Sequence, residues 1–99
     1  MIIPEKLKVL GHEYKVTIDD KVRRHHSTSG TCCINTNEID LEAGGPESKQ
    51  AETFLHEIFE AIKYHLDLGD DLEHRTLSQL SKVLFAVIRD NDLDFRRGK

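Results

Sequence analysis

Three polar residues on one predicted helix have the types and spacing to carry chemistry: His56, Glu57 and Glu60. They lie in the run TFLHEIFEAI (residues 53–62), in which apolar residues recur at helical spacing. Positions 56 and 60 are one turn apart, so their side chains point the same way from the helix. A histidine and a carboxylate placed in this way could bind one metal ion, with Glu57 beside it as a general base.

The helical signature of hydrolytic zinc sites is His-Glu-x-x-His, in which both histidines reach the metal. In this chain Glu60 stands where the second histidine would be. Zinc accepts a carboxylate at bond lengths close to those of imidazole. A catalytic zinc also needs a third protein ligand and an open position for water.

The chain contains several further histidines that could supply the third ligand. His65 is nine residues after His56, about 180° round the helix at 100° per residue, and it should face away. His12 lies in a predicted hairpin turn, and His25 and His26 lie in a polar loop. These last three remain open as candidates, although nothing in their surroundings supports them.

His74 is better placed than the other histidines. If the chain reverses near Gly69, His74 returns alongside the helix about one turn beyond Glu60. Adjacent helix axes are about 8–10 Å apart, a gap that two facing side chains can span with a metal between them. The spacing permits ligation by His74 without determining which way its side chain faces.

A solvated polar stripe would give a similar pattern, with Glu60 pairing Lys63 or Tyr64. Against this, His56 and Glu60 have bulky apolar neighbours, which indicates partial burial and a need for a partner. The spacing by itself therefore leaves the metal site and the solvated stripe both open.

The first half of the chain predicts four short strands. Residues 6–10 and 14–18 alternate apolar and polar types around a turn at Gly11, as in a β-hairpin. Residues 30–34 and 38–41 are two further strands joined by an Asn-Thr-Asn turn. These segments predict a small, largely antiparallel sheet.

The second half predicts two helices. The first runs from Pro46 to Leu66 or Asp67, with Gly69 as its stop. The second starts with a cap at Asp70 or near Thr76, and ends near residues 90–91. Its apolar stripe comprises Leu77, Leu80, Leu84, Phe85, Val87 and Ile88.

The order of these elements, sheet first and two helices second, predicts a single α+β domain over residues 1–99. The net charge of −4, with 18 acidic against 14 basic residues, argues against a nucleic-acid partner. No apolar run has membrane-spanning length, and the first residues lack the pattern of a signal peptide. We therefore expect a cytoplasmic protein that has no membrane partner.

The two cysteines, Cys32 and Cys33, are neighbours in a predicted strand. Neighbouring side chains of a strand point to opposite faces, so a disulfide between them would be strained. We predict one buried and one exposed thiol in preference to a metal or redox role.

The stretch from residue 53 to residue 95 resembles small phage and prophage proteins that look like minimal zincin-type metallopeptidases. The resemblance is carried by Thr-x-x-His-Glu-Ile-x-Glu-x-Ile, by a histidine before the last helix, and by Val-x-Arg-Asp-Asn at its end. Residues 30–41 also resemble the strands that precede the metal helix in such proteins. Zincins usually have a histidine at the position of Glu60. The resemblance implies metal ligands at His56, Glu60 and His74, and a general base at Glu57.

This resemblance implies a zinc-dependent hydrolase, most simply a peptidase acting on a peptide or protein. An extended substrate could add to an exposed edge of the sheet. The alternative is a non-catalytic phage accessory protein that binds another protein and keeps a structural or vestigial metal site. Mixed nitrogen and oxygen ligands leave other divalent metals open beside zinc. The oligomeric state is also left open.

Overall fold

The computed structural model describes residues 3–20 and 29–91, in which four strands are followed by two long helices. This order confirms the predicted α+β class. The elements are β1 (Lys6–Val9), β2 (His12–Asp19), β3 (Gly30–Cys33), β4 (Glu38–Glu42), α2 (Glu47–His65), the 3-10 helix η1 (Gly69–Leu72) and α3 (His74–Asn91).

The strands form one sheet in the order β1-β2-β4-β3. The outer pairings, β1 with β2 and β3 with β4, are antiparallel as predicted. The central strands β2 and β4 run parallel, with Thr17 opposite Asp40, so the sheet is mixed. Two hairpins are thus joined through their second strands, and β3 is left at an edge of the described sheet.

The first hairpin turns one residue earlier than predicted. Val9 pairs with His12, so only Leu10 and Gly11 form the turn. Their φ angles of 52° and 85° match a two-residue turn of type I′, whose twist suits the flanking strands. His12 and Glu13 therefore belong to β2 rather than to the turn.

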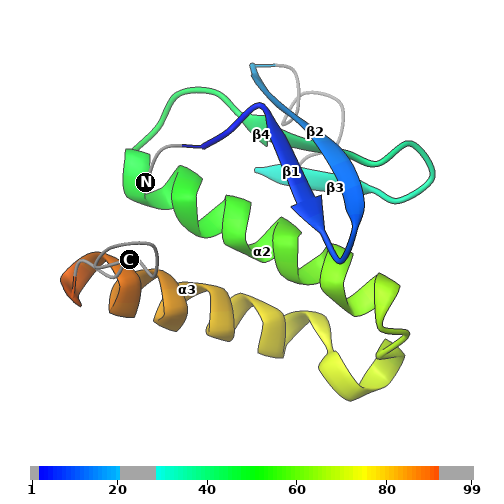
Figure 1. The fold of residues 1–99 in the computed structure, drawn as a ribbon. Helices are drawn as coiled ribbons and strands as arrows, with labels where there is room; N and C mark the ends of the chain where they lie inside the picture. Colours follow the sequence, from blue (N-terminus) through cyan, green and yellow to red (C-terminus); the bar gives the residue numbers. More distant parts are fainter. Residues whose placement is uncertain (1–2, 21–28, 92–99) are drawn as a thin grey trace, which may run out of the picture.

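Helix α2 is the central layer, with the sheet on one side and α3 along the other (Figure 1). Each side of the helix has its own apolar core. The core between α2 and the sheet includes Tyr14, Val16, Ile39, Leu41, Phe54 and Ala61. The core between α2 and α3 includes Ala51, Leu55 and Phe85.

Helix α2 ends in a Schellman arrangement before the predicted stop at Gly69. The N–H of Leu68 donates to the Lys63 carbonyl at 3.0 Å, and the N–H of Asp67 donates to the Tyr64 carbonyl at 3.1 Å. Asp67 takes the left-handed conformation, with φ of 53°. Aspartate tolerates this region better than most residues, so no glycine is needed there.

Helix α3 begins at His74, between the two predicted starts at Asp70 and Thr76. The preceding residues form η1, and Glu73 then takes an extended conformation with ψ of 160°. The Glu73 carbonyl accepts the first helical hydrogen bond, from the N–H of Leu77 at 3.0 Å. This start places His74 in the first turn of α3.

The predicted apolar stripe of α3 is only partly buried. Leu77 and Phe85 are buried, Phe85 against Ala51 and Leu55 of α2, but Leu80 and Val87 are 45% and 43% exposed. Because α3 packs chiefly on α2, it buries one narrow face. No helix in the described part of the chain has the length and apolar character needed to cross a membrane.

Gly30 allows β3 to approach α2 closely, and we expect Gly30→Ala to lower the free energy of unfolding by about 1–3 kcal/mol. An added Cβ would lie 2.6 Å from Thr53 Cγ2 and 3.2 Å from Leu41 Cδ2. Thr53 cannot yield easily, since its side chain is β-branched and its hydroxyl donates to the Lys49 carbonyl at 3.0 Å. Urea unfolding of the wild type and the variant measures this loss.

Thr53→Ser supplies the matched background for this measurement, because serine removes Cγ2 and keeps the hydroxyl. The cost of Gly30→Ala should be smaller in this background. An equal cost in both backgrounds would show that contact with Thr53 is not the cause.

Candidate metal centre

Helix α2 presents His56 and Glu60 toward the cleft that lies between β3 and the first half of α3. The two positions are one turn apart, and their side chains are 14% and 30% exposed. The predicted partial burial is therefore confirmed. It arises because neighbouring apolar residues of α2 pack on both the sheet and α3.

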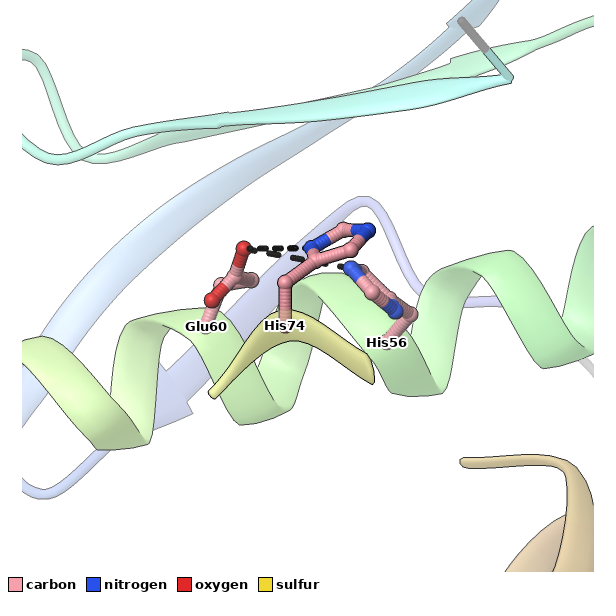
Figure 2. Close-up of side chains that lie close together, drawn as sticks. All are labelled: His56, Glu60 and His74. Atoms are coloured by element: carbon pink, nitrogen blue, oxygen red, sulfur yellow. Dashed lines mark ion pairs between the residues drawn. The ribbon is translucent and has the colours of Figure 1, made fainter. Parts of the chain in front are cut away.

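His74, the first residue of α3, completes a group of three side chains that point toward one another (Figure 2). His56 Nε2 lies 3.8 Å from Glu60 Oε2, and His74 Nδ1 lies 3.7 Å from the same oxygen. One ligand atom from each residue lies within 4.8 Å of the other two. The group brings together the three metal ligands that the sequence predicted.

These separations suit a small metal ion. Two ligands of a tetrahedral zinc at about 2.1 Å are separated by about 3.4 Å. The two measured distances to Glu60 Oε2, 3.7 and 3.8 Å, exceed this value by only a few tenths of an ångström. His74 can adjust further because its side chain is 73% exposed. The ligand atoms of the two histidines lie within 4.8 Å of each other, so the group could hold a metal ion once His74 moves closer to His56.

The surroundings of His56 favour its neutral form. Burial lowers the pKa of its imidazole most, the charge of His74 lowers it further, and Glu60 acts in the opposite direction. A neutral imidazole is the form that ligates a metal. His56 is therefore better prepared as a ligand than as the cationic partner of an ion pair.

Glu57 is the most buried acid of this region, with 7% of its surface exposed. Burial raises the pKa of its carboxyl group to about 7, and the nearby charge of Glu60 contributes in the same direction. A carboxyl group with a pKa near neutral pH can both accept and return a proton. This property fits the role of general base that the sequence predicted for Glu57.

The four residues line one cleft of about 490 Å³ between β3, α2 and the first half of α3. One wall is the edge strand β3, which contributes Gly30, Thr31 and Cys32. Lys49 and Lys82 lie along the same cleft. The space is large enough for part of an extended peptide chain to lie beside the predicted ligands.

Cys32 faces this cleft from β3, which the sequence did not reveal. Both cysteines are free thiols; Cys33 is exposed as predicted, whereas Cys32, expected to be buried, is only partly buried against the core. Burial, followed by the charges of Glu57 and Glu60, raises the pKa of the Cys32 thiol to about 12. Cys32 does not belong to the converging ligand group and stays protonated at neutral pH.

Ser78 is a second residue of the site that the sequence pattern did not indicate. Its hydroxyl oxygen lies 3.4 Å from His56 Nδ1, and it lines the cleft. Its position one turn after His74 on the same helix is the signal that could have identified it.

The other histidines of the described chain lie elsewhere. His65 Nε2 lies 2.6 Å from the hydroxyl of the buried Tyr14, and its ring stacks on His12 with a centroid distance of 4.0 Å. Neither belongs to the converging group, as helix geometry predicted for His65. His25 and His26 lie outside the described residues.

Comparison of this chain with protein-family models, curated proteins and solved structures yields no match. The resemblance to zincin-type peptidases therefore stays a prediction from the sequence motifs. His56, Glu60 and His74 converge on one point, and Glu57 lines the same cleft.

Proposed function

We propose that this chain is a zinc-dependent hydrolase that cleaves peptide bonds. The convergence of His56, Glu60 and His74 carries this proposal. Three protein ligands leave a fourth position open for water, as catalytic zinc sites require and closed structural sites do not. Imidazole with carboxylate is a ligand set that suits zinc.

The remaining residues have definable roles in such a reaction. A bound zinc would lower the pKa of water toward about 7 and polarise a substrate carbonyl. Glu57 takes the proton of the attacking water and returns it to the leaving amine, for which a pKa of about 7 is well suited. The substrate lies along β3, whose outer edge has no neighbouring strand among the described residues.

The first test is the zinc content of the chain and its peptide cleavage. Protein stripped with a chelator and reloaded should hold close to one zinc per chain by elemental analysis. It should also cleave members of a fluorogenic peptide library. His56→Ala should lose both properties, because it removes the least exposed ligand nitrogen of the group. His12→Ala is the matched control, since His12 is an exposed histidine outside the group. Wild-type protein without zinc would overturn the proposal.

A second function, protein binding without catalysis, is favoured by one surface feature of α3. Leu80, Val83, Leu84 and Val87 are 38–62% exposed and recur at helical spacing. Contiguous exposed apolar residues of this kind often mark protein contacts. In this case the chain is an accessory protein with a structural or vestigial metal. If the Glu57→Gln variant still binds zinc and still has the full biological effect of the wild-type protein, the hydrolase proposal fails.

A further inference from the structure

The N-terminal half of α3 carries two polar residues with the same four-residue spacing as the two predicted ligands on α2. His74 and Ser78 are one turn apart on α3, as are His56 and Glu60 on α2. His74 lies 3.7 Å from Glu60 Oε2, and Ser78 Oγ lies 3.4 Å from His56 Nδ1. His74 of α3 therefore lies against Glu60 of α2, and Ser78 of α3 lies against His56 of α2.

The two ring nitrogens of His56 have different partners. Nε2 lies 3.8 Å from Glu60 Oε2, toward the point where the ligand atoms converge, whereas Nδ1 lies near the hydroxyl of Ser78. A neutral imidazole carries one N–H and one free lone pair, and the hydrogen bond of one nitrogen selects the form of the other. A hydroxyl oxygen at Nδ1 can accept the N–H and leave the Nε2 lone pair free.

We propose that Ser78 is a positioning residue that accepts the Nδ1–H of His56 and thereby directs Nε2 to the metal. This inference rests on the proposed metal site. Partners that hold the second nitrogen of a ligand histidine typically strengthen metal binding about 10- to 100-fold. Ser78 acts through His56 and need not contact the metal or the substrate.

Ser81 offers a matched control on the same helix. It also lines the cleft, but its hydroxyl donates to the Leu77 carbonyl of its own helix at 2.8 Å. Ser81→Ala removes the same atom as Ser78→Ala without a change at His56. Ser78→Thr keeps a hydroxyl group near His56 and is the conservative variant.

The experiment measures zinc affinity by competition with a chromophoric chelator at pH 7.5. Ser78→Ala should bind zinc about 10- to 100-fold more weakly, while Ser78→Thr and Ser81→Ala should stay close to the wild type. Circular dichroism of each variant checks that the helices are intact. Equal affinities of the Ser78→Ala and Ser81→Ala variants would overturn the proposal.

Nitrogen NMR of the His56 ring in metal-free protein gives a second readout that separates the two proposals. The wild type should carry its proton on Nδ1, whereas Ser78→Ala should show a mixture of both tautomers. If the wild type binds no zinc, the metal site fails, but this spectrum still decides whether Ser78 orients the ring. An unchanged tautomer in Ser78→Ala would exclude that role.

Discussion

Glu57→Gln is expected to slow peptide hydrolysis strongly and at the same time to make the metal-free protein more stable at pH 8. Loss of a positioned general base typically lowers the rate about 10²- to 10⁴-fold. The gain in stability has a separate origin, because Glu57 is a buried carboxyl group of α2. Glutamine has nearly the same shape and carries no charge.

The direction of the pH dependence follows from the raised pKa of Glu57. The folded carboxyl titrates at about 7, against 4.5 for an ordinary glutamate. Between these values the folded protein holds a proton that the unfolded chain has released, so stability falls as the pH rises through this range. Each pKa unit corresponds to 1.36 kcal/mol, so the full effect is about 3 kcal/mol. Glu57→Gln should therefore raise the free energy of unfolding by about 3 kcal/mol at pH 8 and by almost nothing at pH 4.5.

Urea unfolding in the presence of a chelator, at pH 4.5 and pH 8, measures this difference. Glu52→Gln, which lies on the same helix and also lines the cleft, is the control and should change stability little at either pH. Parallel pH profiles for the wild type and Glu57→Gln would contradict the buried-charge argument. Hydrolysis retained by zinc-loaded Glu57→Gln would exclude Glu57 as the base.

The helix that carries the site is predictable from local pattern alone. Helix α2 has apolar residues at regular helical spacing, and its bounds agree with the prediction to within one or two residues at each end. The same periodicity places His56 and Glu60 on one side of the helix and excludes His65 from that side. The prediction that His74 lies near Glu60 required only a chain reversal of ordinary length between the helices. Asp67 and η1 provide this reversal.

Other features depend on packing that a local pattern does not contain. The parallel pairing of β2 with β4 joins strands that are separated in the sequence by residues 20–37, which include β3, and nothing in either strand specifies its neighbour. Cys32 and Ser78 enter the site only because β3 and α3 lie on opposite sides of the cleft. The apolar pattern of α3 likewise could not tell which residues α2 covers, and Leu80 remains exposed.

Zinc is expected to stabilise the fold by linking α2 to the first turn of α3. At a free zinc concentration one thousand times its dissociation constant, the free energy of unfolding should rise by about 4 kcal/mol. His56 and Glu60 come from α2 and His74 from α3, so unfolding must release the ion from all three. The gain should shrink as the solution is made acidic, because protons then compete with the metal for imidazole nitrogen.

His74→Ala isolates this effect, because the His74 side chain is 73% exposed and its loss should cost the metal-free protein little. At a fixed zinc concentration, each tenfold loss of affinity removes about 1.4 kcal/mol of the gain. Chemical unfolding with and without zinc should therefore show a much smaller shift in His74→Ala, and a full shift in His12→Ala. Equal zinc-induced changes in the free energy of unfolding in both variants would mean that zinc binds elsewhere. A loss of this change confined to His74→Ala would identify the α2–α3 junction as the place where zinc stabilises the fold.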